Sequence, residues 1–266
     1  MSLNFAAISP HPPIIVPQIA GQDLAKVSST VLAMKKLATI FQKAEIDTLI
    51  IVSPHLLIYP DRFNVCAMKK LFGTFAPFDH PEIITESNND LDLVADLEKE
   101  MINSGINHVI YDNGGEFFEL DHGTMVPLNY LSKNQEFTFK VVPIAYSNLD
   151  RAQHFAFGQI LKDVCQKYSG RVGIIASGDL SHSLLDGING KKFDEKLIED
   201  LKNNNLKEIL YYDEDFVQEA RECGYRSILI LLGAVDGLGL RPEFLSYEGP
   251  FGVGYLVLNY DIKENQ

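Results

Sequence analysis

Residues 47–55 read DTLIIVSPH, and this stretch decides the fold prediction. Thr48 to Val52 form a continuous, largely apolar run rich in β-branched residues, which is typical of a strand buried on both faces of a mainly parallel sheet. Ser53-Pro54 then ends the strand, because proline has no N–H and pushes the preceding residue toward extended geometry. His55 is therefore predicted just past the carboxyl end of the strand, where open α/β sheets bind their ligands.

The same three residues occur near the N-terminus as Ser9-Pro10-His11, after the strand-like run Leu3 to Ile8. Between the two motifs, residues 22–43 carry apolar side chains at three- and four-residue steps, the pattern of a helix with one buried stripe. Strand, helix and strand in this order form a βαβ unit, which predicts that the two strands are parallel neighbours. His11 and His55 are thus expected on the same rim of the sheet.

Strand and helix patterns alternate along the rest of the chain, and no low-complexity linker or solenoid-length repeat separates them. We therefore predict a single α/β domain over residues 4–262, with three α/β/α layers and a mainly parallel or mixed central sheet. The sequence pattern of residues 213–232 predicts one or two helices with a break near Gly224. Residues 69–89 show no periodicity, so we expect a loop there that covers a pocket.

Composition and charge limit the class of protein. The chain has 266 residues, 46% of them hydrophobic and 22% charged, which is ordinary globular usage. A formal net charge of −13 and a pI near 4.9 argue against a nucleic-acid or anionic-membrane surface, since these partners attract clustered Lys and Arg. A homo-oligomer is the default expectation for a soluble enzyme of this kind.

The cysteines and the hydropathy pattern predict a cytoplasmic protein. Cys66, Cys165 and Cys223 are odd in number and share no metal-site spacing, so we expect reduced thiols, each a small core residue without an assigned function. No apolar run approaches the roughly 18 residues of a membrane span, and the N-terminus has no signal-peptide pattern.

Histidines mark the candidate site. Four of the seven follow strand-like runs or open a helix, namely His11, His55, His122 and His182. His122 lies between Asp121 and Gly123, and His182 ends the run Gly-Asp-Leu-Ser-His at 178–182, after another apolar strand pattern. A single histidine of this kind is more often a hydrogen-bonded loop residue, but four at such positions favour a site. His80, His108 and His154 lack this context and are assigned no function.

Two neutral imidazoles and one carboxylate form the facial triad typical of non-haem iron(II) oxygenases. Glu248 is the natural carboxylate, because Gly249, Gly252 and Gly254 leave room for a metal and a substrate. Fe(II) is thus the expected cofactor and Zn(II) the alternative. Two histidines and a glutamate also suit catalytic zinc, so a metal-dependent hydrolase remains open.

Together these motifs resemble the catalytic subunit of class III extradiol ring-cleavage dioxygenases, the LigB superfamily. The likeness runs from His11 to Tyr255, in the family's order, over Ser-Pro-His at 9–11 and 53–55, Asp-His-Gly at 121–123, Gly-Asp-Leu-Ser-His at 178–182, and Tyr-Glu-Gly-Pro-Phe-Gly-Val-Gly-Tyr at 247–255. The strongest similarity is to the branch found with the AmmeMemoRadiSam proteins, which also resembles Memo.

This resemblance implies functions for individual residues. His11, His55 and Glu248 are the implied metal ligands, His182 is the implied acid/base, and His122 is a second pocket histidine that steadies substrate or bound oxygen. Memo-like relatives carry a cysteine in place of the carboxylate ligand, so the retained Glu248 favours an iron(II) site. Asp121 and Asp179 are expected either to orient histidine rings or to cap loops.

The implied activity is that of a non-haem Fe(II)-dependent extradiol dioxygenase, an oxidoreductase of aromatic compound catabolism that opens the ring of a small catecholic substrate with O₂. The alternative is a Memo-like metal-binding protein of the same fold, acting in a radical-SAM-associated modification system without dioxygenase activity. Protocatechuate-type enzymes close the pocket with a small second subunit. Residues 69–89 are expected to take that part here, unless the substrate differs.

Overall fold

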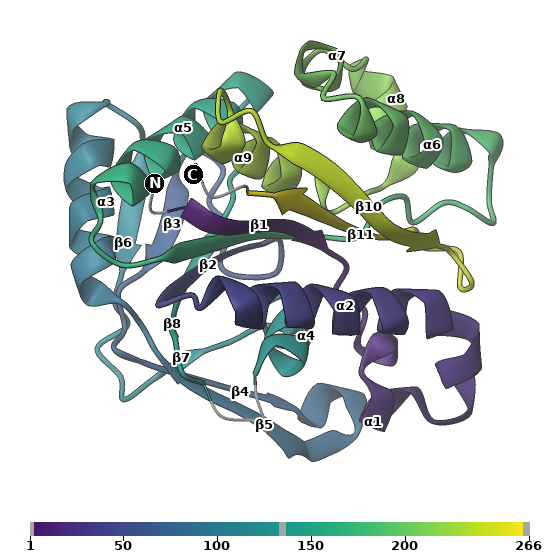
Figure 1. Ribbon diagram of the computed structural model, residues 1–266, viewed down its shortest axis with the longest axis horizontal. Coiled ribbons are helices and arrows are strands. Elements are labelled where there is room, and N and C mark those ends of the chain that lie inside the picture. Colours follow the sequence, from purple (N-terminus) through teal and green to yellow (C-terminus); the bar gives the residue numbers. More distant parts are fainter. Residues whose placement is uncertain (1–2, 133–136, 263–266) are drawn as a thin grey trace.

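A computed structural model describes residues 3–132 and 137–262 of the chain, and its centre is an 8-stranded sheet (Figure 1). The strand order is β10-β11-β1-β9-β2-β8-β3-β6. These strands are Leu3–Ser9 (β1), Thr48–Ser53 (β2), Phe63–Cys66 (β3), His108–Tyr111 (β6), Lys140–Ala145 (β8), Val172–Ser177 (β9), Arg241–Glu248 (β10) and Tyr255–Asp261 (β11).

The helices lie between these strands in the chain, as the alternating pattern predicts. They are Pro17–Ala20 (α1), Ser28–Ala44 (α2), Leu91–Asn103 (α3), His122–Leu131 (α4), Arg151–Lys167 (α5), Ile188–Lys202 (α6), Leu206–Leu210 (α7), Glu214–Ala220 (α8) and Tyr225–Val235 (α9). Short 3₁₀ segments cover Pro13–Ile15, Gly21–Val27 and Ala76–Phe78. None of the helices in the described part of the chain is both long and apolar enough to cross a membrane.

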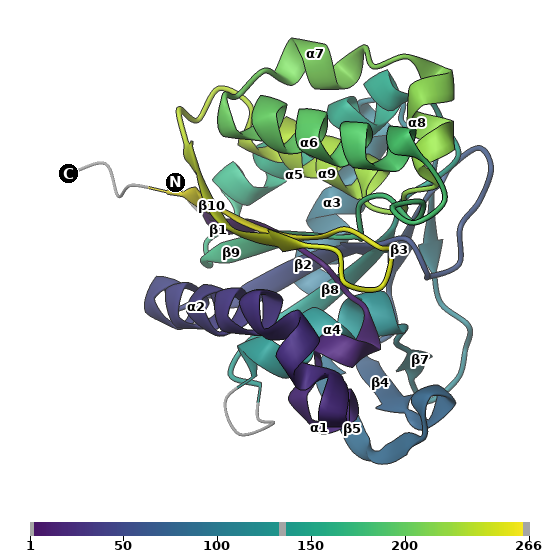
Figure 2. The ribbon, with the colours of Figure 1, turned by 90° about the vertical axis from the view of Figure 1, so that its right-hand side faces the viewer.

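Helices cover both faces of the sheet (Figure 2). α3, α5 and α9 pack on one face, with α6, α7 and α8 beyond them, whereas α2 and α4 pack on the other. Strand side chains alternate between the two cores: Leu49 and Ile51 join α2 and α4, while Ile50 and Val52 join α5 and α9. The predicted α/β class, with three layers and a mixed sheet, is therefore confirmed.

β1 and β2 are parallel but are not neighbours, so this part of the βαβ prediction is wrong. β9 lies between them and pairs in parallel with both; Ser9 is in register with Ser177, and Val52 with Ala176. A βαβ pattern fixes the hand of the crossover, but it does not exclude a third strand that arrives later in the chain. The segment after Ser177 therefore emerges between the two Ser-Pro-His segments.

Residues 69–89 form a β-hairpin where we expected a loop. Lys70–Phe75 (β4) pairs antiparallel with His80–Asn88 (β5), and Phe118–Glu119 (β7) completes a 3-stranded sheet. Alternate residues of β5 are buried, but Thr85 and Ser87 are among them, so no apolar alternation marks this strand in the sequence.

Two glycines bring α5 and α9 into backbone contact. A Cβ on Gly158 would lie 1.9 Å from the carbonyl oxygen of Ile230, and a Cβ on Gly233 would lie 2.0 Å from that of Phe155. Only glycine permits this approach. It fixes the position of α9, whose first residue, Tyr225, comes two positions after Cys223.

Candidate metal centre

Three parallel strands deliver the site residues to one rim of the sheet. β1, β9 and β2 each end in a serine, at Ser9, Ser177 and Ser53. Because the strands are parallel and in register, these serines lie at the same edge. The segments that follow are Pro10-His11, Gly178-Asp179 and Pro54-His55.

The four histidines predicted for the site lie close together at this rim. The Nε2 atoms of His11 and His55 are 3.1 Å apart. His122, the first residue of α4, stacks on His55 with ring centroids 4.2 Å apart and meets His11 edge-on at 5.3 Å. His182 belongs to the same rim, because its ligand atom, a carboxylate oxygen of Asp179 and the sulfur of Cys223 lie within 4.8 Å of one another.

Cys223 stands at the centre of this arrangement, although we expected a core residue like Cys66 and Cys165, which are indeed buried. Its sulfur is 3.5 Å from Nε2 of His11, and the ligand atoms of His11, His55 and Cys223 all lie within 4.8 Å of one another. The backbone N–H of Asp179 donates to this sulfur over 3.2 Å. Among the described residues, Cys223 is thus common to both groups that can hold a metal ion.

Glycines on two loops explain how the thiol reaches the rim. A Cβ on Gly178 would lie 2.1 Å from the Cα of Gly224, so the loop after β9 and the loop before α9 touch through their backbones. This contact sets Cys223 against Asp179. The only sequence signal for it was the helix break at Gly224, which did not by itself distinguish a ligand from a core thiol.

Glu248 is placed differently from the other predicted ligands. Its Oε1 atom accepts hydrogen bonds from the backbone N–H of Thr30 at 2.7 Å and from the Thr30 hydroxyl at 2.6 Å, in the first turns of α2. Neither of the two groups of potential metal ligands in the described residues includes Glu248. The structure therefore brings His11 and His55 together without Glu248, whose function as a ligand stays a prediction.

Ser177 orients the ring of His11. The Ser177 hydroxyl donates its one proton to the carbonyl of Gly123 and lies 2.9 Å from Nδ1 of His11. Nδ1 must then carry the proton and donate to Ser177, which leaves the lone pair on Nε2, the atom that faces His55 and Cys223. The His11 backbone N–H also donates to Oδ1 of Asp179 over 3.0 Å.

The surroundings of the four histidines favour their neutral form. Desolvation lowers the pKa of His11, His55, His122 and His182, and the neighbouring rings lower that of His11 further. Burial also raises the pKa of Asp179 to about 7, although the hydrogen bond from the backbone N–H of His11 acts to lower it. Neutral imidazoles with free lone pairs are the form that binds a metal.

Burial, followed by the charge of Asp179, raises the pKa of Cys223 well above its usual value. A nearby cation reverses this tendency, because it stabilises the thiolate.

Asp121 acts as a helix cap, one of the two functions expected for it. Its Oδ1 accepts from the backbone N–H of Thr124 over 2.7 Å, at the start of α4, and its Oδ2 accepts from the Ser53 hydroxyl. The cap sets the start of α4 at the rim. Gly123 is required here, because a Cβ would lie 2.3 Å from the Ser53 hydroxyl oxygen.

A cavity of about 480 Å³ opens beside His55 and His122. The β4–β5 hairpin contributes Phe78, whose ring meets that of His122 at 5.4 Å, and Tyr111 and Phe118 form further aromatic walls. Residues 69–89 therefore do line a pocket, as expected, although they do so as a hairpin.

Comparison with known proteins gives a match to one family over nearly the whole chain. The family model "Catalytic LigB subunit of aromatic ring-opening dioxygenase" matches residues 5–258. Protein CA_C1420 of Clostridium acetobutylicum is 33% identical over 276 residues, covering 100% of this chain and 59% of the relative. A MEMO1 family protein of Methanosarcina mazei is 28% identical over 154 residues, covering 57% of this chain and 56% of the relative.

A dioxygenase and a solved structure extend the comparison. The 3,4-dihydroxyphenylacetate 2,3-dioxygenase of Escherichia coli is 23% identical over 224 residues, with 76% of this chain and 78% of the enzyme covered. The crystal structure of an uncharacterized protein of Escherichia coli K12 has the same fold, with a TM-score of 0.69 at 17% identity, covering 97% of this chain and 99% of that one. This chain thus spans less than two thirds of the first two relatives. With both a dioxygenase and MEMO1 family proteins among its relatives, and a family match from residue 5 to residue 258, the chain belongs to the LigB family.

Proposed function

We propose that this chain is a metal-dependent oxidoreductase that opens the ring of a small catecholic compound with O₂. The observation that carries the proposal is a cluster of histidine rings and one thiol beside a cavity with aromatic walls. Metal donors and aromatic side chains thus share one rim, which is what a ring-cleaving enzyme needs. The similarity to a dioxygenase of Escherichia coli supports the same reaction.

The donor set fits a transition metal, with His11 and His55 as two ligands. For the third ligand there are two candidates, Glu248 and Cys223. Glu248 would have to leave its two hydrogen bonds with Thr30, whereas Cys223 already lies 3.5 Å from His11 and needs only to lose its proton. We therefore assign Cys223 as the third ligand of Fe(II). Zn(II) also accepts two imidazoles and a thiolate.

The chain's own groups can carry the proton transfers of ring opening. A bound metal supplies Lewis acidity and electron transfer to O₂. The lowered pKa of His182 leaves its ring neutral at pH 7, so that it can accept the proton of a substrate hydroxyl and return it later. His122 lines the cavity and can donate a hydrogen bond to an oxygen that gains negative charge. Phe78 and Phe118 can hold a flat ring and exclude water.

The thiol also favours a second function, a Memo-like metal-binding protein that acts in a radical-SAM-associated modification system without dioxygenase activity. A cysteine ligand departs from the two-histidine, one-carboxylate set typical of iron(II) oxygenases. The similarity to MEMO1 family proteins from Methanosarcina and Methanocaldococcus species supports this alternative.

The deciding experiment measures oxygen uptake by protein loaded anaerobically with Fe(II), against a panel of catechols, with absorbance reporting the yellow ring-opened product. The variants are His182→Ala, Cys223→Ser and Glu248→Gln, with His108→Ala on the edge strand β6 as a matched control. Iron content is measured on every sample, because a variant that lacks metal says nothing about proton transfer.

Uptake that needs iron, a catechol and His182 would support the dioxygenase, provided that the His182→Ala protein keeps its iron. Loss of iron in Cys223→Ser but not in Glu248→Gln would support the thiolate ligand, and the reverse would restore Glu248. Fully loaded protein that consumes no oxygen with any catechol would favour the Memo-like alternative.

A further inference from the structure

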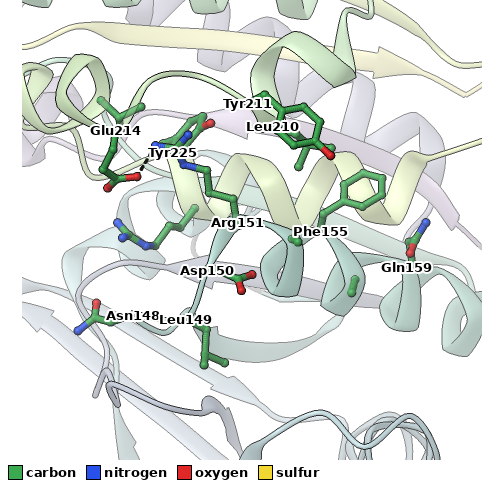
Figure 3. A pocket seen from close by; sticks show the side chains of 14 residues that line it. Asn148, Leu149, Asp150, Arg151, Phe155, Gln159, Leu210, Tyr211, Glu214 and Tyr225 are labelled. Atoms are coloured by element: carbon green, nitrogen blue, oxygen red, sulfur yellow. Dashed lines mark hydrogen bonds and ion pairs between the residues drawn. The ribbon is translucent and has the colours of Figure 1, made fainter.

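A second cavity, of about 580 Å³, lies between the start of α5 and the helices α7, α8 and α9 (Figure 3). It shares no lining residue with the cavity beside His55 and His122. In Figure 3, Arg151 and Glu214 lie on one side of this cavity, and Phe155, Leu210 and Tyr211 lie on the other. It is therefore amphipathic, with charged groups facing an apolar wall.

The two arginines of this cavity differ in how well they are paired. Arg151 donates to the carbonyl of Tyr212 and forms an ion pair with Glu214 at 2.6 Å, drawn as a dashed line in Figure 3. Arg226, in the first turn of α9, is half-buried and makes no ion pair and no side-chain hydrogen bond within residues 3–132 and 137–262. Its guanidinium carbon lies 5.9 Å from the centroid of the Tyr146 ring, and its positive charge acts against the burial that raises the pKa of Glu222.

The nearby acidic groups make their hydrogen bonds to other residues. Glu222 accepts from the backbone N–H of Tyr225 over 2.5 Å, and Asp150 caps α5 by accepting from Gln153 over 2.8 Å. Glu214 forms the ion pair with Arg151 described above. A guanidinium keeps its charge at every physiological pH and presents a planar set of donors that matches a carboxylate. Within the part of the chain that the structure describes, Arg226 is thus a half-buried cation that feels the carboxyl group of Glu222 but forms no direct ion pair.

The apolar part of the cavity lining selects what kind of anion fits. Apolar surface in this cavity comes from Leu149, Phe155, Leu210 and Val217. Tyr211 also lines the cavity, and this residue is 77% exposed to solvent. An inorganic anion would leave this surface in contact with water, whereas an organic acid with an apolar body would cover it. We propose that this cavity binds a small aromatic or alkyl carboxylate, whose carboxylate pairs with Arg226 and whose body packs on Phe155 and Tyr211.

The test is calorimetric titration of the full chain with phenylacetate. The protein is treated with a chelator, so that the acid cannot bind through a metal at the rim. 2-Phenylethanol, which lacks the charge, and sulfate, which lacks the apolar body, are titrated in parallel. Arg226→Gln and Tyr211→Ser remove one half of the site each. Arg221→Gln is the matched control, because Arg221 is exposed and its nearest carboxylate partner, Asp186, is 3.9 Å away.

We expect saturable binding of one phenylacetate per chain, weakened by about tenfold or more in Arg226→Gln, by less in Tyr211→Ser, and unchanged in Arg221→Gln and His55→Ala. Arg226→Lys should recover part of the affinity and serves if Arg226→Gln does not fold. The absence of saturable binding up to about 10 mM, equal binding by Arg226→Gln or by 2-phenylethanol, sulfate binding as tight as phenylacetate, or loss of binding in His55→Ala would each overturn the proposal.

Discussion

The segments Ser9-Pro10-His11 and Ser53-Pro54-His55 have the same sequence and both follow a parallel strand, yet their histidines are held differently. His11 is only 2% exposed; Ser177 fixes its ring, and its backbone N–H is bound to Asp179. His55 is exposed, its backbone N–H donates to Ser53 over 3.3 Å, and its ring contacts the rings of His11 and His122.

The difference follows from what surrounds each strand end. β1 lies between β9 and β11, so the loop after it is covered by the loops that carry Asp179 and Cys223. β2 ends beside the aromatic cavity instead, and His55 lines that cavity. One motif therefore supplies a fixed histidine and a histidine that faces the aromatic cavity. The sequence of the motif alone does not determine which is which.

The largest effect should come from removing the two histidines separately. Each substitution to Ala is expected to lower metal affinity by about 100-fold or more, because a ligand is lost. His11→Ala should also destabilise the metal-free protein by about 2–4 kcal/mol, since it leaves a buried cavity and unpaired partners, whereas His55→Ala should change stability by less than about 0.5 kcal/mol. Urea unfolding and chelator-competition titrations measure the two quantities. Equal destabilisation by both variants would show that His11 is not held more firmly than His55.

A buried histidine away from the rim gives the next effect, on pH dependence. His154 in α5 is fully buried, and desolvation lowers its pKa to about 4. The unfolded chain binds the proton more readily, so this contribution to stability is complete above about pH 6.5 and is lost as the pH falls toward 4.

When the pH falls from 7 to 4.5, the free energy of unfolding should therefore decrease by about 2 kcal/mol less in His154→Gln than in the wild type. The half-buried His108 on β6 provides the control His108→Gln, which removes a histidine elsewhere in the chain. A wild-type slope in His154→Gln would refute this explanation of acid lability.

A smaller effect tests how Ser177 fixes the ring of His11. Ser177→Ala removes the hydroxyl that holds Nδ1 of His11, and metal affinity should fall by about tenfold with little change in stability. Ser9→Ala is the matched control, because Ser9 is in register with Ser177 but its hydroxyl donates to the Pro10 carbonyl and, among the described residues, hydrogen-bonds to no histidine ring. Equal metal affinity in the two variants would remove Ser177 from the account of the site.

The smallest effect concerns the substrate side. Phe78→Ala removes an aromatic wall next to His122 and should weaken binding of 4-nitrocatechol to the metal-loaded protein by about two- to fivefold. Phe72 lies on the same hairpin but packs against Phe117 and lines a different cavity. Phe72→Ala should therefore leave the affinity unchanged, as an absorbance titration can establish. A similar loss in both variants would indicate a general disturbance of the hairpin.

Local patterns predicted the strand ends and the histidines correctly, because these depend on nearby residues. The run Thr48 to Val52, the break at Pro54 and the four histidines at the rim are examples. The order of the strands depends on pairing across the whole chain, so the insertion of β9 between β1 and β2 could not be read from the βαβ pattern.

The site was predicted less completely, for the same physical reason. Cys223 reaches the rim through the contact between Gly178 and Gly224, which are distant in the sequence and carry no periodic signal. The hairpin strand β5 was missed because Thr85 and Ser87 occupy buried positions. The bounds of the domain, 4–262, and the full ligand set remain predictions.

The position of β9 also affects how the protein is made. The strand that separates His11 from His55 begins at Val172, later in the chain than either histidine, and the thiol comes later still at residue 223. Pairings over such distances form slowly, and they require most of the chain to be present. A nascent chain that ends before β9 therefore cannot assemble the cluster of histidines and thiol, and the proposed metal would bind there only after the sheet is complete.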